Sequence, residues 1–160
     1  VYVGSDDGHV YAIAPDGRLR WRVALGGYIR AGGAVTLDHA LVAVTYGPHP
    51  RVVKLALDDG HTLWSVAVQG PPTADYGIAS APLVDADNAV AVGTPDDAVL
   101  VIEEDGRVRV RRAMPADVDS PPVLLEDGVV AVGCDDGALY LLGEAPDAGA
   151  PGPTTRADAR

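Results

Sequence analysis

The chain has 160 residues and a net charge of −11, with 23 acidic against 12 basic residues. A protein that attracts phosphate needs a concentrated positive surface, so this balance argues against nucleic acid as a partner. The single cysteine, Cys134, excludes an intrachain disulfide and a cysteine-based metal cluster. No apolar run reaches the length of a membrane-spanning helix, so we expect no direct membrane span.

The sequence motif at the start of the chain is repeated near its end. Residues 1–13 (VYVGSDDGHVYAI) align without gaps with residues 130–142 (VAVGCDDGALYLL), and seven of the thirteen positions are identical. Residues 90–102 follow the same template, and a weaker copy with a longer turn starts at Val42. The copies therefore start near residues 1, 42, 90 and 130, a spacing typical of repeats built from four-stranded units.

Each copy divides into short strands. In the first copy, residues 1–5 and 9–14 favour strands and are joined by Asp7-Gly8, a strong hairpin signal. Residues 18–23 alternate arginine with apolar side chains, and residues 34–37 supply a further apolar strand. This pattern predicts an all-β protein, an arc of a β-propeller built from four-stranded antiparallel blades. A β-sandwich is the alternative, but the strands of a sandwich do not copy one another without gaps.

A small set of residues marks the repeat at equivalent positions. This structural signature consists of Gly4, Asp7, Gly8, Trp21, Gly60, Trp64, Gly93, Gly133, Asp136 and Gly137. The pattern resembles the repeat of PQQ-like (quinoprotein-type) β-propellers, which reads roughly V-Y-V-G-S-x-D-G-x-L-Y-A-L-D, followed by a Gly and then a Trp. The resemblance extends from residue 1 to about residue 142. It implies that Trp21 and Trp64 dock against the neighbouring blade, and that the joint with Val110 at this position is weaker.

The strands of the four copies do not complete a ring. We count fourteen strands, about three and a half blades, whereas propellers of this family have seven or eight. The chain is therefore part of a longer protein, or self-associates into a ring, or forms an open arc. The repeats occupy residues 1–143, and the Pro/Ala/Asp-rich residues 144–160 are expected to be a disordered tail or linker.

The residues predict no catalytic, cofactor-binding or metal-binding site, and no cofactor. The paired aspartates, such as Asp6-Asp7 and Asp135-Asp136, recur at equivalent repeat positions, which indicates a role in the turns. The four histidines are His9, His39, His49 and His61, and none is spaced from another as zinc ligands are on one element.

Two stretches exceed the repeat pattern, residues 46–51 (YGPHPR) and 69–77 (QGPPTADYG). Insertions in repeat proteins usually form loops on a binding face, so we predict a protein partner there. The contact candidates are Tyr46, His49, Arg51 and Tyr76.

The resemblance covers proteins of several functions. PQQ-like repeats occur in quinone-dependent dehydrogenases, in the outer-membrane assembly lipoprotein of Gram-negative bacteria, and in sensor proteins. We predict a non-catalytic scaffold, and the resemblance implies a periplasmic or cell-surface location. A fragment of a PQQ-dependent dehydrogenase and the extracytoplasmic sensor domain of a receptor or kinase are the alternatives.

Overall fold

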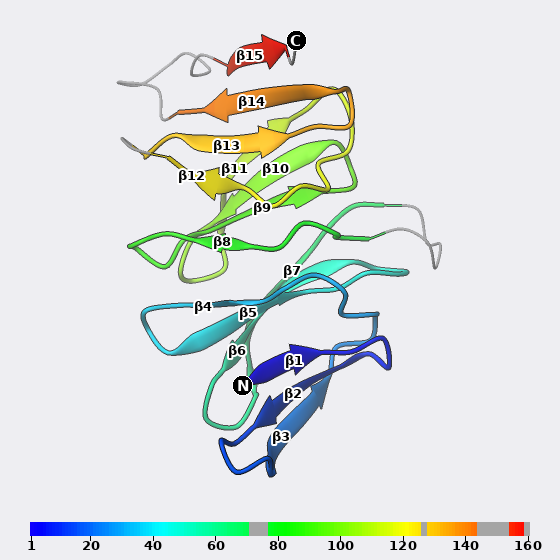
Figure 1. Cartoon of the computed structure of the whole chain (residues 1–160), viewed down its shortest axis with the longest axis vertical. Coiled ribbons are helices and arrows are strands. Elements are labelled where there is room, and N and C mark those ends of the chain that lie inside the picture. Colours follow the sequence, from blue (N-terminus) through cyan, green and yellow to red (C-terminus); the bar gives the residue numbers. More distant parts are fainter. Residues whose placement is uncertain (71–76, 126–127, 144–153, 159–160) are drawn as a thin grey trace.

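Four antiparallel sheets follow one another along the chain in the computed structural model (Figure 1), which describes residues 1–70, 77–125, 128–143 and 154–158. We call the sheets blades 1 to 4 in chain order. Figure 1 shows them arranged along the longest axis, with blade 1 at the bottom and blade 4 at the top. The all-β prediction is confirmed.

Each blade is built from strands that are consecutive in the chain. Blade 1 contains β1 (Tyr2–Gly4), β2 (His9–Ile13) and β3 (Leu19–Ala24). Blade 2 contains β4 (Ala34–Val35), β5 (Ala40–Val44), β6 (Arg51–Ala56) and β7 (Thr62–Ala67). Blade 3 contains β8 (Leu83–Val84), β9 (Val90–Thr94), β10 (Ala98–Ile102) and β11 (Val108–Ala113). Blade 4 contains β12 (Val123–Leu124), β13 (Val130–Gly133), β14 (Ala138–Leu142) and β15 (Thr154–Asp158).

The strand register corrects the boundary of the second copy. The two-residue strands β4, β8 and β12 pair with the following strand in one common register. The opposed pairs are Val35 with Leu41, Val84 with Val90, and Leu124 with Val130. The second copy therefore starts at Leu41 and not at Val42. A one-residue shift exchanges the two faces of a strand, so it decides which side chains of blade 2 face blade 1.

Strand β15 corrects the expected number of strands. The sequence predicts no ordered structure in residues 144–160, but residues 154–158 form β15, which pairs antiparallel with β14. This expectation is wrong for β15 because pairing requires backbone donors and acceptors at an open strand edge, not apolar side chains. The rest of the expected tail, residues 144–153 and 159–160, lies outside the described residues.

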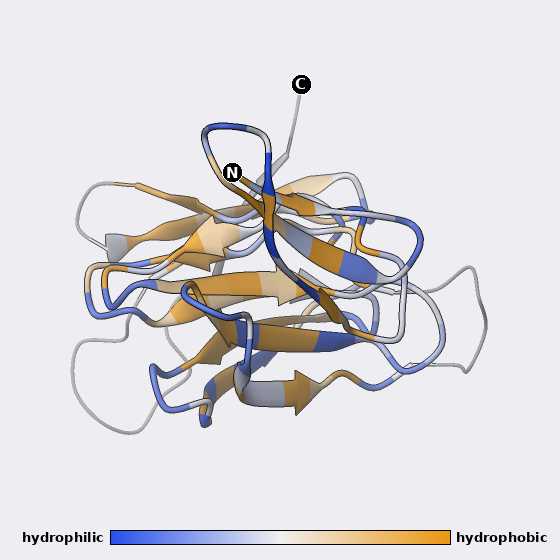
Figure 2. Ribbon diagram, turned by 90° about the horizontal axis from the view of Figure 1, so that it is seen from below, coloured by the Kyte–Doolittle hydropathy of each residue, from blue (hydrophilic) through white to orange (hydrophobic). Residues whose placement is uncertain are grey.

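Apolar clusters join successive blades. One cluster lies between blades 1 and 2, a second between blades 2 and 3, and a third between blades 3 and 4. Every residue of β5 and of β9 is buried, because neighbouring blades cover both faces of blades 2 and 3. Figure 2 shows hydrophobic residues concentrated in the strands and hydrophilic residues in the connections. The described part of the chain contains no helix long and apolar enough to cross a membrane.

Two tryptophans connect blades through the same arrangement. Trp21 of blade 1 donates from Nε1 to the Leu57 carbonyl of blade 2 at 2.9 Å, and Trp64 of blade 2 donates to the Glu104 carbonyl of blade 3 at 2.9 Å. Each ring lies against a glycine with positive φ. A Cβ at Gly60 would lie 2.6 Å from the Trp21 ring, and one at Gly106 would lie 2.7 Å from that of Trp64. The turns Asp59-Gly60 and Asp105-Gly106, which follow β6 and β10, thus each provide a flat surface, here called the glycine seat, on which the indole of the preceding blade packs.

Candidate functional site

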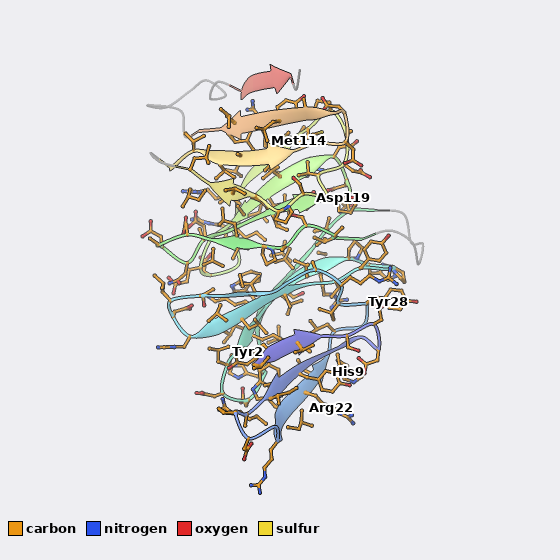
Figure 3. The ribbon with its side chains drawn as sticks, in the orientation of Figure 1. Tyr2, His9, Arg22, Tyr28, Met114 and Asp119 are labelled. Carbon is orange, nitrogen blue, oxygen red and sulfur yellow. The ribbon has the colours of Figure 1, made fainter. Side chains whose placement is uncertain are left out.

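The turns between β1 and β2, β5 and β6, β9 and β10, and β13 and β14 lie at one end of the blades. The links between successive blades lie at the same end. In three places a link is bonded to such a turn. Leu25 donates to the Gly8 carbonyl at 2.8 Å, Val68 to that of Pro50 at 2.9 Å, and Met114 to that of Asp97 at 2.8 Å. We call this end the loop face. Figure 3 shows His9, Tyr28 and Asp119 along this side of the molecule, on the right.

The loop between β5 and β6 in blade 2 is longer than the equivalent turn of blade 1. In blade 1 the turn is closed by the Ser5 amide, which donates to the His9 carbonyl four residues on at 3.1 Å. In blade 2 the Thr45 amide donates to the Arg51 carbonyl six residues on at 3.0 Å. The loop is therefore two residues longer, as the sequence predicts for residues 46–51. His49 has a φ of 65°, which reverses the chain inside this loop.

The backbone of Tyr46 is held on both sides. On one side Tyr28 and Tyr46 exchange two amide–carbonyl hydrogen bonds, each 2.8 Å long. On the other side Tyr46 forms a bridge with Gly77, and the Ile78 amide donates to Thr45 at 3.2 Å. A Cβ at Gly77 would collide with the Tyr46 backbone, so only glycine allows this approach. The inserted loop therefore presents Tyr46 from a fixed backbone.

An arginine stacks on both tyrosine rings. The Arg30 guanidinium carbon lies 4.6 Å from the ring centre of Tyr28 and 4.9 Å from that of Tyr46. The same guanidinium donates to both Asp6 carboxylate oxygens, at 3.0 and 3.4 Å, and this carboxylate raises the pKa of Arg30. Arg30 thus connects blade 1 to the link that follows it and keeps the two rings together.

A pocket of about 320 Å³ opens on the loop face beside these rings. Its lining includes Tyr28, Tyr46 and Pro48, together with Asp6 and Asp7. The remaining lining residues are Gly8, Ala24, Gly26 and Gly27.

Asp7 remains ionised over the physiological range. The hydrogen bond from the Tyr11 hydroxyl lowers the pKa of Asp7 to about 2, and the His9 amide, which donates to it at 3.0 Å, contributes in the same direction. Asp136 has the same pair of donors in blade 4, the Ala138 amide at 3.0 Å and the Tyr140 hydroxyl at 2.6 Å. The bonds of Asp7 therefore belong to the repeat, whereas the pocket beside it is lined by residues of blade 1, of the link that follows it and of the loop of blade 2.

A second group of carboxylates lies on the loop face between blades 3 and 4. Burial raises the pKa of Asp117, and the neighbouring carboxylates of Asp97, Asp119 and Asp135 raise it further. Burial and Asp135 also raise the pKa of Asp119. Among the described residues, no group of three or more His, Cys, Asp or Glu side chains is placed to hold a metal ion.

The predicted contact residues are not all in one place. Tyr46 lines the pocket, and His49 is exposed in the same loop. Arg51 is half-buried at the start of β6, where its amide donates to the Thr45 hydroxyl at 2.9 Å. Tyr76 lies outside the described residues.

Sequence reasoning missed Tyr28, Arg30 and Asp6 as members of this site. Tyr28 and Arg30 lie in a link between strands, and no repeat position marks them. The signal in the sequence is an aromatic and a basic residue placed between two glycine pairs, Gly26-Gly27 and Gly32-Gly33.

The glycines of the repeat signature lie in turns or beneath the links between blades. Gly8 and Gly137 both have a φ of 84° in equivalent turns. A Cβ at Gly4 would collide with Ile29, and one at Gly93 would collide with Val118, so both glycines lie under a link between blades. Gly133 donates to the Ser120 hydroxyl at 2.8 Å in the corresponding place in blade 4.

Comparisons with known proteins agree with this architecture. A family model described as outer membrane protein assembly factor BamB matches the chain over residues 1–90 and again over residues 49–143. A comparison with curated proteins finds no match.

The chain also resembles parts of several longer solved structures. The chain resembles BamB from Moraxella catarrhalis with a TM-score of 0.74 and 20% identity, over 88% of this chain and 45% of that one. It resembles Sqt1 from Saccharomyces cerevisiae with a TM-score of 0.73 and 14% identity, over 89% of this chain and 40% of that one. A protein of unknown function from Bacteroides caccae has a TM-score of 0.62 and 15% identity, over 99% and 60%. The propeller prediction is confirmed, and the sandwich alternative is excluded. The chain spans less than half the length of the first of these relatives.

Proposed function

The chain belongs to the PQQ-like repeat family described as outer membrane protein assembly factor BamB, and on that premise we propose that it is a non-catalytic scaffold that binds a protein partner on its loop face. The observation that carries this proposal is the inserted loop of blade 2. Its Tyr46 is fixed by backbone bonds on both sides and borders an open pocket. Aromatic side chains held rigidly beside a pocket are typical anchors of protein interfaces.

The charge of the loop face favours a basic partner segment. Asp6 is neutralised by Arg30, whereas Asp7 contributes a negative charge to the lining of the pocket. The chain as a whole carries a net charge of −11, which attracts a basic segment over a longer range. A lysine or arginine of the partner would match the charge of the Asp7 carboxylate.

We place this activity in the bacterial cell envelope, in the periplasm or at the cell surface. The support is the family alone, because the description of the matching model names an outer-membrane assembly factor. A role in the assembly of other envelope proteins is part of the same proposal.

Site-specific photo-crosslinking tests the scaffold proposal. A photoreactive phenylalanine analogue replaces Tyr46 or His49 on the loop face, and Leu37 serves as the matched control because it is highly exposed in the turn between β4 and β5 at the opposite end. We expect light-dependent adducts with one envelope protein from positions 46 and 49 and none from position 37. Equal adducts from both ends would contradict a binding site on the loop face.

A further inference from the structure

The outer strand of blade 2, β7, has an open edge. The strand order β4-β5-β6-β7 places β6 on one side of β7, and no strand among the described residues pairs with its other side. Alternate amides and carbonyls of an edge strand point away from the sheet, so they can bond a further strand. Blades 1 and 3 flank blade 2 along the molecule (Figure 1), and their outer strands β3 and β11 are edges of their sheets in the same way.

Arginines protect the outer strands of blades 1 and 3. Arg20 and Arg22 are exposed on β3, and Arg109 and Arg111 are exposed on β11. Charged side chains on an edge strand oppose its pairing with another chain, because pairing would remove them from water. These two edges are therefore closed to further strands.

The outer strand of blade 2 lacks this protection. Leu63 and Ser65 flank Trp64, in the positions where blades 1 and 3 have the four arginines. Leu63 is 48% exposed, and Ser65 is exposed beside it. None of the six residues of β7 (TLWSVA) is charged, and threonine, tryptophan and valine favour extended backbone. Of the outer strands β3, β7 and β11, only β7 is thus open to pairing. We call residues 62–67 the blade 2 edge.

We propose that the blade 2 edge binds an extended segment of a protein partner, which adds to the four-stranded sheet as a further antiparallel strand. Antiparallel addition continues the pattern of the blade, in which all neighbouring strands are antiparallel. Backbone hydrogen bonds supply the affinity, and alternate side chains of the segment lie against Leu63. This proposal does not depend on the binding site at the loop face.

The two ends of the blade 2 edge indicate the chemistry of the segment. At one end the Val68 amide donates to the Pro50 carbonyl of the inserted loop at 2.9 Å, so the edge reaches the loop face. At the other end the turn before β7 carries the exposed carboxylates of Asp58 and Asp59. An antiparallel segment has its C-terminal end beside this turn. The matching segment is therefore uncharged along the strand and carries lysine or arginine at its C-terminal end.

Peptide binding to the whole chain tests the proposal. The probe is a labelled peptide of about eight alternating threonines and valines that ends in a lysine pair. Fluorescence anisotropy should show saturable binding, and Leu63→Arg/Ser65→Arg should weaken it about tenfold or more. Arginine occupies the same positions in β3 and β11, so this variant should fold, which circular dichroism checks.

A matched control adds the same two charges at the opposite edge of the same blade. Val35 and Leu37 lie at the inner strand β4 and are 53% and 70% exposed. Val35→Arg/Leu37→Arg should bind the peptide as the wild type does. The photo-crosslinks from the loop face test the other site separately, so each proposal can fail alone.

Two N-methylated forms of the peptide give the sharpest arm of the test, because they need no variant of the protein. One form carries the methyl groups on the threonine amides and the other on the valine amides. Alternate amides of a strand point to opposite edges, so one form should retain binding and the other should lose it. Loss in both forms or in neither would contradict strand addition.

Three further results would overturn the proposal. The first is no saturable binding of the unmodified peptide, and the second is equal binding by the wild type and Leu63→Arg/Ser65→Arg. The third is a wild-type chain that sediments as a dimer and that Leu63→Arg/Ser65→Arg makes monomeric, since a second copy would then occupy the edge.

Discussion

The joints that follow blades 1 and 2 differ from the one that follows blade 3. Trp21 and Trp64 each cross a joint with an indole ring, a hydrogen bond to a backbone carbonyl and a glycine seat. In blade 3 the corresponding residue is Val110, which is exposed on the outer strand β11. Like the other two joints, the third joint has an apolar cluster, in which Met114, Cys134 and Tyr140 take part. A repeat fold therefore tolerates the loss of its most characteristic residue at one joint when inner packing is kept.

The joint between blades 2 and 3 also contains a buried ion pair. Lys54, the only lysine of the chain, is 1% exposed, and its Nζ donates to Asp38 at 2.8 Å and approaches the Glu104 carbonyl at 3.5 Å. The equivalent residue in blade 1 is Ala12, which is buried and apolar. An ion pair therefore stands at this joint where blade 1 has a methyl group.

Removing a tryptophan should have the largest effect on this comparison. Trp21→Ala is expected to lower the free energy of unfolding by about 3–5 kcal/mol, because a large buried ring and a hydrogen bond are both lost. Val110→Ala, at the equivalent exposed position, should cost less than about 1 kcal/mol. Urea unfolding followed by circular dichroism measures both. Equal losses would show that the indole is not what distinguishes the joints.

Breaking the ion pair from one side should have the next largest effect. Asp38→Ala is expected to cost about 3 kcal/mol, because it leaves the buried Lys54 ammonium without its partner. The double variant Asp38→Ala/Lys54→Met should regain most of this loss, since methionine fills the space without a charge. Thermal and urea unfolding of both variants test this. If the double variant is no more stable than Asp38→Ala, the effect of Asp38 does not act through Lys54.

The pH dependence of the same pair follows from the pKa of Asp38. Burial raises that pKa, but the hydrogen bonds from Lys54 and Thr36 outweigh burial, and the net pKa is lowered. A lowered pKa in the folded state contributes stability above the carboxyl's unfolded pKa of 3.8 and loses it as the pH falls below that value. Unfolding titrations between pH 7 and pH 3 should therefore show a steeper loss for the wild type than for the double variant.

A methyl group in the glycine seat should have a smaller effect. Gly106→Ala places a Cβ 2.7 Å from the Trp64 ring at a φ of 87°, so both the contact and the backbone are strained. Gly17→Ala is the matched control, since its φ is 84° but no atom lies within 4 Å of the added Cβ. We expect Gly17→Ala to cost about 1–2 kcal/mol from the backbone alone, and Gly106→Ala to cost more. Similar losses in urea unfolding would mean that Trp64 moves aside freely.

Neutralising one carboxylate at the third joint should have the smallest effect, and a stabilising one. Burial and the neighbouring carboxylates raise the pKa of Asp117, so its ionised form is disfavoured in the folded state. Stability from such a group is present at low pH and is lost as the pH rises through the folded pKa. Asp117→Asn should therefore raise the urea midpoint at pH 7 and have little effect below about pH 4. A loss of stability at pH 7 would contradict the inferred repulsion.

The repeat and the site were not equally predictable. Turns and alternation are local, so residues 1–14 and 130–142 could be assigned to hairpins from their own letters. The inserted loop at residues 46–51 could also be predicted, because it interrupts the repeat spacing. Tyr28, Arg30 and Asp6 were not, since their meeting with Tyr46 depends on how the link between blades folds back on the turn of blade 1.

The sequence by itself determined the all-β class, the repeat, the hairpin turns and the tryptophan positions, because each depends on neighbouring residues or on a fixed period. Only the tertiary structure decided the register of the second copy, since Leu41 and Val42 are equally apolar and pairing with Val35 selects between them. It also decided the place of β15, because an open strand edge accepts backbone of almost any sequence. Finally, it decided which of two equivalent apolar residues is buried, Val10 or Leu139, because burial depends on whether another blade lies against the face.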